Sequence, residues 1–200
     1  MKKLLLIGAM LCALCSCGSS SSKKALTGTH EGQEWVDLGL PSGLKWATCN
    51  LGAENPEGFG DQYYWGATTP GYDCACPSVG KSWGDIGGNP DRDAATSGWG
   101  GSWRMPTKNE CQELVDNCTW EWTTQDDHTG YKVTGPNGQS IFLPVPYDGG
   151  ADYEVCWYWS STPDESDDEQ ACILCLSKGG RSMYGNPREF CNGVRPVLAD

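Results

Sequence analysis

Histidine and basic residues are scarce in this chain of 200 residues, and each shortage argues against a class of function. The chain has two histidines, and Lys and Arg number 14 against 26 Asp and Glu, for a formal net charge of −12. An acidic chain without a basic stripe repels nucleic acid and anionic membrane surfaces, so we expect neither to be a partner. His30 and His128 stand in polar stretches, and no HExxH, Gly-x-Ser-x-Gly or phosphate-loop motif occurs. We therefore expect no enzyme activity.

Long apolar runs are missing as well, apart from residues 4–14 behind two lysines at the N-terminus. That run is too short to span a bilayer as a mature helix but typical of a secretory signal peptide. The segment Leu14-Cys15-Ser16-Cys17 resembles a bacterial lipobox, so we expect residues 1–16 to be removed and Cys17 to be lipidated. Several acyl chains give stable anchoring, which predicts an exported protein held at the outer membrane or cell surface. An ordinary signal peptide that leaves a secreted protein is the alternative.

Composition then divides the rest of the chain into two parts. Residues 17–32 are Ser-rich and polar, which predicts a flexible tether. Residues 33–200 suit one domain with a real core. The 27 Gly, 12 Pro and 10 Trp favour short strands, many turns and an aromatic core over long helices.

Local patterns predict an α+β domain of antiparallel strands with one or two short helices and long loops. The clearest helix follows Pro106, where Thr107 and Glu110 form a capping box and an apolar face extends to Cys118. Residues 52–103 are loop-dominated, with a strand only at 62–65. The other expected strands are two hairpins, 34–40 with 44–49 and 131–134 with 139–143, and three C-terminal strands at 157–161, 171–177 and 193–198.

Seven phrases in a fixed order resemble the Fibrobacter succinogenes major paralogous domain, common in exported proteins of gut Bacteroidetes, over roughly residues 34–198. The phrases are Trp35 to Thr48, Tyr64-Trp65-Gly66, Trp99-Gly100 with Trp103 to Thr107, Gly130 to Gly135, Ile141 to Pro144, Tyr158 to Thr162, and Val194 to Val197. That family looks related to the C-terminal domain of the Legionella collagen-like adhesin. The resemblance implies a C-type-lectin-like fold, which hosts sugar binding, protein binding and catalysis alike.

The resemblance also bears on individual residues. The family often has cysteine where this chain has Cys49 and Cys118, which makes these two the disulfide candidates. Arg104 and Arg195 stand in family phrases, and we expect both to pair with carboxylates or backbone carbonyls rather than with a ligand.

Nine cysteines follow Cys17, an odd number, and export permits disulfides. Cys172 and Cys175 form a CxxC motif, but the motif lies in an expected strand. Positions i and i+3 of a strand point to opposite faces, so we expect a structural role rather than a redox pair.

An acidic run at residues 164–169 raises the question of calcium, because carboxylate oxygens are its preferred ligands. Asp164, Asp167 and Asp168 are the candidate ligands. The run lacks the spacing of a known calcium loop, so a solvated loop without metal or other cofactor is the favoured interpretation.

Aromatic side chains make the best case for ligand binding, because Trp and Tyr stack on sugar rings and anchor protein interfaces. In the strand at 157–161, Trp157 and Trp159 share one face and Tyr158 the other, and most tryptophans are expected in the core. We expect loops at about 55–98, 148–168 and 180–192 to bind a glycan or a host or bacterial surface protein, as in adhesion. The candidate ligand-binding residues are Tyr63, Tyr72, Trp83, Tyr158 and Tyr184.

Two other functions stay open. One is a structural envelope lipoprotein with no small ligand. The other is a C-type-lectin-like receptor diversified by a retroelement, which varies its C-terminal segment. In that case the variable residues would be Cys156, Cys172, Cys175, Met183, Tyr184, Asn186, Arg188, Glu189, Phe190 and Asn192.

Overall fold

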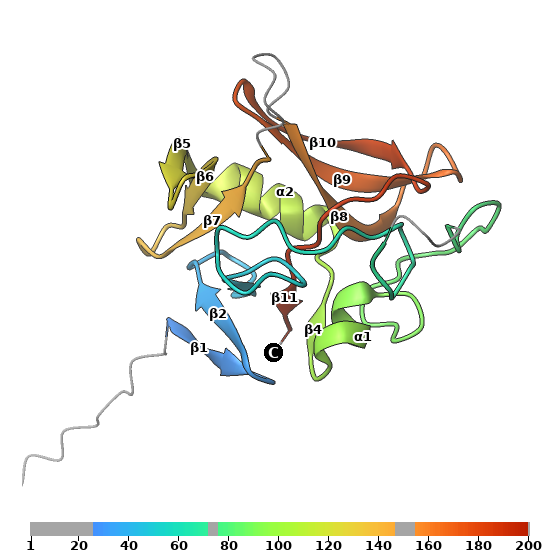
Figure 1. The fold of residues 1–200 in the computed structure, drawn as a ribbon, viewed down its shortest axis with the longest axis horizontal. Coiled ribbons are helices and arrows are strands. Elements are labelled where there is room, and N and C mark those ends of the chain that lie inside the picture. The colour runs from blue at the N-terminus through green and yellow to red at the C-terminus, as the bar shows by residue number, and fades with distance from the viewer. Residues whose placement is uncertain (1–25, 72–75, 147–154, 200) are drawn as a thin grey trace, which may run out of the picture.

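Three antiparallel sheets and two short helices make up the described part of the chain in the computed structural model, which covers residues 26–71, 76–146 and 155–199 (Figure 1). The α+β architecture expected from the sequence is confirmed. The five-stranded sheet has the order β1 (Thr27–His30), β2 (Gln33–Asp37), β3 (Lys45–Ala47), β11 (Val197–Leu198) and β4 (Trp103–Arg104). The other elements are β5 (Thr119–Gln125), β6 (His128–Thr134) and β7 (Ser140–Pro144) in one sheet, β8 (Val155–Pro163), β9 (Gln170–Ser177) and β10 (Gly180–Pro187) in another, and helices α1 (Ala94–Trp99) and α2 (Lys108–Asn117).

The two ends of the domain meet in the five-stranded sheet, because β11 lies between β3 and β4. The prediction of a flexible tether is wrong over its last residues, since Thr27–His30 form β1 and pair with β2. The His30 carbonyl accepts a hydrogen bond from Trp103 Nε1 over 3.0 Å. Strand pairing and this hydrogen bond therefore attach β1 to the domain although β1 has little apolar content. Cys17 and the expected signal peptide lie outside the described residues.

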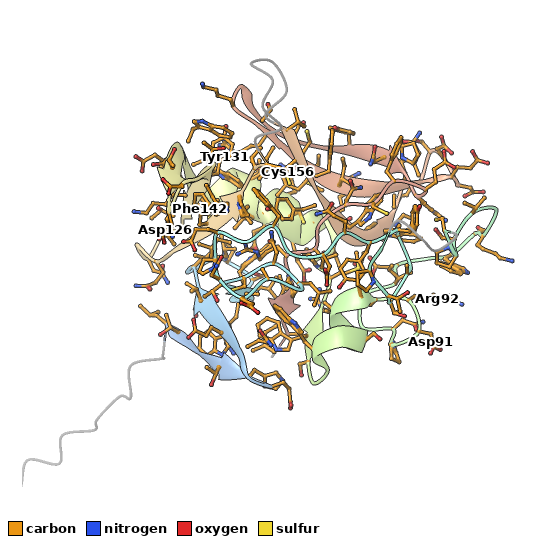
Figure 2. The ribbon with its side chains drawn as sticks, in the orientation of Figure 1. Asp91, Arg92, Asp126, Tyr131, Phe142 and Cys156 are labelled. Carbon is orange, nitrogen blue, oxygen red and sulfur yellow. The ribbon has the colours of Figure 1, made fainter. Side chains whose placement is uncertain are left out.

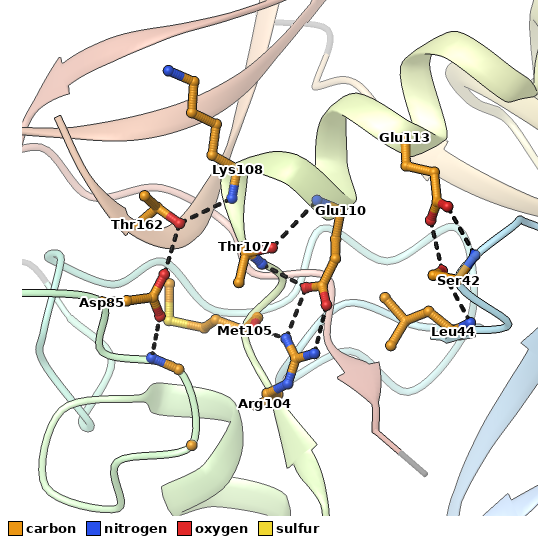
Figure 3. A network of polar contacts seen from close by, with 12 residues as sticks. Ser42, Leu44, Asp85, Arg104, Met105, Thr107, Lys108, Glu110, Glu113 and Thr162 are labelled. Atoms are coloured by element: carbon orange, nitrogen blue, oxygen red, sulfur yellow. Dashed lines mark hydrogen bonds and ion pairs between the residues drawn. The ribbon is translucent and has the colours of Figure 1, made fainter. Parts of the chain in front are cut away.

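Helix α2 begins where its capping box predicts (Figure 3). Thr107 Oγ1 accepts from the Glu110 N–H over 3.3 Å, and Glu110 Oε2 accepts from the Thr107 N–H over 2.7 Å. Both Glu110 oxygens also accept from Arg104, over 2.8 and 2.6 Å. The structural role expected for Arg104 is therefore confirmed.

The sheet β8–β9–β10 has buried residues on both of its faces. On β9, Leu174 and Leu176 belong to the larger apolar cluster, together with Tyr131 and Cys156, which Figure 2 labels. Ala171 and Ile173 belong to a second cluster with Trp159. Because one sheet separates the two clusters, alternation along its strands decides which cluster each side chain enters.

The expected hairpins are confirmed as β2–β3 and β6–β7, and the expected C-terminal strands as β8, β9 and β11. Five elements were not expected from the sequence: β1, β4, β5, β10 and α1. The strand expected at 62–65 is reduced to an isolated bridge between Tyr63 and Asn192. Residues 180–187, expected as a binding loop, form the edge strand β10.

Candidate binding cleft

Three exposed aromatic side chains lie in or directly after the strands of the β8–β10 sheet. The exposed fractions are 40% for Trp157 in β8, 42% for Tyr184 in β10 and 54% for Phe190 in the turn after β10. Trp157 Nε1 donates a hydrogen bond to the Tyr184 hydroxyl over 2.8 Å, which fixes the two rings relative to each other. The only other exposed large hydrophobic side chains of the described residues are Leu26 and Val79. Exposed aromatic side chains that occur together mark a binding surface more often than scattered ones do.

Strand register explains why Trp157 and Tyr184 meet although they are far apart in sequence. Trp157 lies opposite Cys175 of β9, and Ser182 of β10 lies opposite Cys175 on the other side. Tyr184, two residues beyond Ser182, therefore shares the face of Trp157. Trp159 is on that face too and is fully buried by the second cluster, so Trp157 stands where this cover ends.

Two cavities open beside Trp157, and we call the pair the Trp157 cleft. The smaller, the Asn192 cavity, has a volume of about 190 Å³, and the larger, the Phe59 cavity, about 360 Å³. Trp157 and Cys191 line both cavities, and none of the described lining residues carries a charge. The Asn192 cavity is lined by Trp157, Asn186, Phe190, Cys191 and Asn192, and the Phe59 cavity by Phe59, Gly60, Gln62, Pro146, Val155, Cys156, Trp157, Tyr158, Cys191 and Gly193.

Asn192 lines this cleft, and its side-chain amide has a hydrogen-bond donor without a partner. Its residue is 2% exposed, and its backbone exchanges two hydrogen bonds with Tyr63, of 2.9 and 3.0 Å. Its side-chain Nδ2 is buried and makes no hydrogen bond. A buried donor left in this state costs about 1–3 kcal/mol of stability.

Of the five aromatic residues expected to bind a ligand, Tyr184 is exposed and hydrogen-bonds Trp157, but it lines neither cavity. Tyr63 and Tyr158 are 5% and 3% exposed, and the expectation that they are accessible is wrong. Tyr63 packs in the second cluster, and its carbonyl accepts from Trp159 Nε1 over 2.8 Å. The Tyr158 hydroxyl donates to the Pro144 carbonyl over 2.8 Å, and its buried side chain lines the inner wall of the Phe59 cavity.

The Trp83 ring is half-buried and packs against neighbouring side chains. Its ring lies 6.3 Å from the Trp65 ring, and the Arg92 guanidinium lies 4.2 Å from its centroid on a half-buried surface. The remaining candidate, Tyr72, lies outside the described residues.

Trp157 was missed because strand alternation assigned it, like Trp159, to the core. Tyr184 was named as a ligand-binding candidate, but Asn186, Phe190 and Asn192 were named only under the diversified-receptor alternative. The signal available in the sequence for this site was therefore the cluster of polar and aromatic residues at 184–192.

The acidic run uses its carboxylates to shape its own loop. Asp164 Oδ1 accepts from the Ser166 hydroxyl and N–H over 2.6 and 2.8 Å, which holds the pKa of Asp164 below its usual value. Asp167 accepts from the Glu169 N–H and the Gln170 amide. Over residues 26–71, 76–146 and 155–199, no three His, Cys, Asp or Glu side chains are grouped to hold a metal ion. The calcium alternative through Asp164, Asp167 and Asp168 thus has no support from the described geometry.

Cys49 and Cys118 are both free thiols, so the expected bridge between them is not formed in this structure and stays a prediction. Cys172 and Cys175 lie in β9 as expected, Cys172 buried and Cys175 packed against the second cluster on the opposite face. Burial raises the pKa of the Cys118 thiol to about 11 and of the Cys156 thiol to about 12. Protonated thiols of this kind are poor nucleophiles and poor redox groups.

The fold and the cleft together describe an α+β domain with a cleft whose described lining is uncharged and includes aromatic side chains. Comparison with known protein families, with curated proteins and with solved structures finds no match to this chain. In the part of the chain that the structure describes, no helix has the length and apolar character needed to cross a membrane.

Proposed function

We propose that this protein is an exported, lipid-anchored binding module whose Trp157 cleft recognises a glycan. The observation that carries the proposal is that exposed Trp157 and Phe190 line uncharged cavities, with the exposed Tyr184 bonded to Trp157. Flat aromatic faces remove the apolar faces of sugar rings from water, and amide groups beside them hydrogen-bond the ring substituents. Asn186, Asn192 and Gln62 supply such amides here.

The fold we infer is the C-type-lectin-like fold. Its support is the sheet in which strands from both ends of the domain pair, with β11 between β3 and β4. Long connections without regular structure, such as residues 48–93 apart from the undescribed 72–75, leave this sheet and return to it. The lipid anchor rests on the Leu14-to-Cys17 motif alone.

Cleft shape favours a glycan over a protein. A stable protein interface buries about 800 Å² on each partner around a central apolar anchor. Here the exposed large hydrophobic side chains that line the cleft are Trp157 and Phe190, and the cavities beside them are small and concave. Two small cavities that share Trp157 in their lining suit consecutive rings of an oligosaccharide better than a broad partner surface.

The experiment is a glycan-array screen of the purified full chain, followed by titration calorimetry on the hits with and without EDTA. We expect saturable binding that EDTA does not change and that Trp157→Ala weakens by about tenfold or more. Val79→Ala is the matched control, because Val79 is 56% exposed and lies outside the cleft. An array without hits, or unchanged affinity in Trp157→Ala, would overturn the proposal, and binding to a surface protein would replace it.

A further inference from the structure

We infer that the Asn192 cavity takes the acetamido group of an N-acetylated sugar, and that the preferred ligand is a neutral oligosaccharide of N-acetylhexosamine. This inference rests on the proposed glycan binding and names its ligand. An acetamido group joins a methyl group to a carbonyl acceptor in one plane. The Asn192 cavity has matching residues, since Trp157, Phe190 and Asn192 line the same small volume.

The unpaired donor is the first reason. Asn192 Nδ2 is buried without a hydrogen bond, while the Asn192 backbone is fixed by its bridge to Tyr63. Bulk solvent does not reach Nδ2 in this conformation, so water does not satisfy it. A rotation of the Asn192 side chain, which lines the cavity, would present Nδ2 to a carbonyl acceptor there. An acetamido carbonyl placed in this cavity would therefore satisfy a group that the protein alone leaves unpaired.

The apolar wall is the second reason. Phe190 is 54% exposed although it lines a cavity, so one side of its ring is available to a ligand. A plain hydroxyl substituent could accept from Asn192 Nδ2 but would bring no apolar group to the Phe190 ring. The acetamido methyl group would cover that ring and gain from leaving water.

Charge excludes the acidic sugars. None of the described residues that line the two cavities is charged, and the whole chain carries a formal charge of −12. A uronate or sialate carboxylate would lose water in this cleft without gaining a cation, which is unfavourable. The ligand is therefore a neutral sugar.

The Phe59 cavity extends the site beyond one ring. Trp157 lines both cavities, so a sugar that places its acetamido group in the Asn192 cavity directs its neighbour toward the Phe59 cavity. Gln62 there offers a further amide to the neighbouring ring. We therefore expect affinity to rise from the monosaccharide to the trisaccharide.

The decisive measurement compares N,N′,N″-triacetylchitotriose, called chitotriose below, with cellotriose on the full chain by titration calorimetry. These trisaccharides share ring number and β-1,4 linkage and differ in the acetamido group. We expect chitotriose to bind about tenfold more tightly, and trigalacturonate not to bind. Equal affinity for chitotriose and cellotriose would overturn this inference but leave the proposed glycan binding intact. Failure of every array glycan would instead overturn the proposed function itself.

Asn192→Asp tests the donor, because it replaces Nδ2 by an oxygen with little change of shape. We expect the ratio of chitotriose to cellotriose affinity to fall toward one. Val79→Asp is the control for the added charge, because Val79 is exposed and lines neither cavity, and it should keep the preference. If Asn192→Asp does not fold, Phe190→Ala gives a second test at an exposed position, with a larger loss for chitotriose than for cellotriose. An unchanged preference in Phe190→Ala would count against the apolar wall and overturn the inference.

Discussion

Arg195 Nε donates a hydrogen bond to Asn50 Oδ1 over 2.7 Å, and this pair connects segments that meet behind the Trp157 cleft. Arg195 is 1% exposed, and its Nη2 donates to the Phe142 carbonyl in β7 over 2.8 Å. Asn50 Nδ2 donates to the Tyr158 hydroxyl over 3.3 Å. Because Tyr158 lines the Phe59 cavity, the network ties the core to the wall of the cleft. The structural role expected for Arg195 is confirmed.

Replacing Arg195 with Met is expected to lower the free energy of unfolding by on the order of 3 kcal/mol, because several buried acceptors lose their donor together. These are Asn50 Oδ1 and the carbonyls of Ala47, Thr48 and Phe142. Urea unfolding with an unchanged slope checks the loss. Arg181→Met is the control, since Arg181 is exposed on β10 with its guanidinium 5.0 Å from the centroid of the Trp120 ring. Equal losses in the two variants would contradict the special role of the buried network.

The Arg104–Glu110 pair predicts a pH dependence. Burial raises the pKa of Glu110, but hydrogen bonds from Arg104 and Thr107 outweigh it, so the pKa lies below its ordinary value. A carboxyl whose pKa is lowered by folding adds stability above its unfolded pKa of about 4.3 and loses it as pH falls through the folded pKa. Wild type should therefore exceed Glu110→Gln in stability near neutral pH, and the gap should close in acid. Unfolding curves of both proteins at a series of pH values measure the gap, and a gap that widens in acid would refute the sign.

Asp93 joins the start of α1 to two neighbouring loops and offers a test of how much that junction contributes. Its Oδ1 accepts from the N–H groups of Ala95 and Thr96 at the start of the helix, over 2.9 and 3.1 Å. Its Oδ2 accepts from Gly88 and Met105, over 2.8 and 2.9 Å. Asp93→Ala should cost on the order of 3 kcal/mol, since a helix cap and two further bonds are lost. Asp93→Ser can restore the cap but not both bridges, so an intermediate melting temperature is expected. A Ser variant as stable as wild type would show that the bridges contribute nothing.

Cysteine reactivity gives a prediction about burial. The pKa of Cys118 is raised to about 11 and that of Cys156 to about 12, mainly by burial. Alkylation of the reduced native protein at about pH 8 should therefore be much slower at these two thiols than in urea, because only the thiolate reacts. Mass mapping of the modified peptides after timed quenching measures the rates. Equal rates in native and urea-unfolded protein would contradict the burial, and a peptide joining Cys49 to Cys118 in an unreduced sample would confirm the expected bridge.

Elements with local signals could be predicted, and elements that depend on distant partners could not. The start of α2 is encoded in Thr107 and Glu110, three residues apart, so sequence alone located it. Strand β10, Gly180–Pro187, carries no apolar alternation and exists because β9 offers it a paired edge. Helix α1 has six residues, too few for a periodic pattern, and Asp93 caps it from outside.

The cleft was hidden for the same reason. Alternation correctly placed Trp157 and Trp159 on one face and Tyr158 on the other. It could not show where the cover of that face ends. The cover comes from Tyr63, Met105 and Val194, which reach β8 only through the tertiary fold. Exposure of Trp157 is therefore a property of distant residues and not of its own strand.

That difference between two neighbouring tryptophans is itself testable. Trp159 is fully buried and donates its Nε1 to the Tyr63 carbonyl over 2.8 Å, so Trp159→Ala should cost about 3–5 kcal/mol through the cavity it leaves. Trp157 is 40% exposed, so Trp157→Ala should lower the free energy of unfolding by less than about 1.5 kcal/mol. Apart from its bond to Tyr184, the Trp157 ring makes few buried contacts that the substitution would remove. Thermal and urea unfolding of both variants, beside their glycan titrations, separates fold from site. If Trp157→Ala unfolds as readily as Trp159→Ala, Trp157 belongs to the core, and a loss of binding in that variant would no longer assign the ring to the ligand.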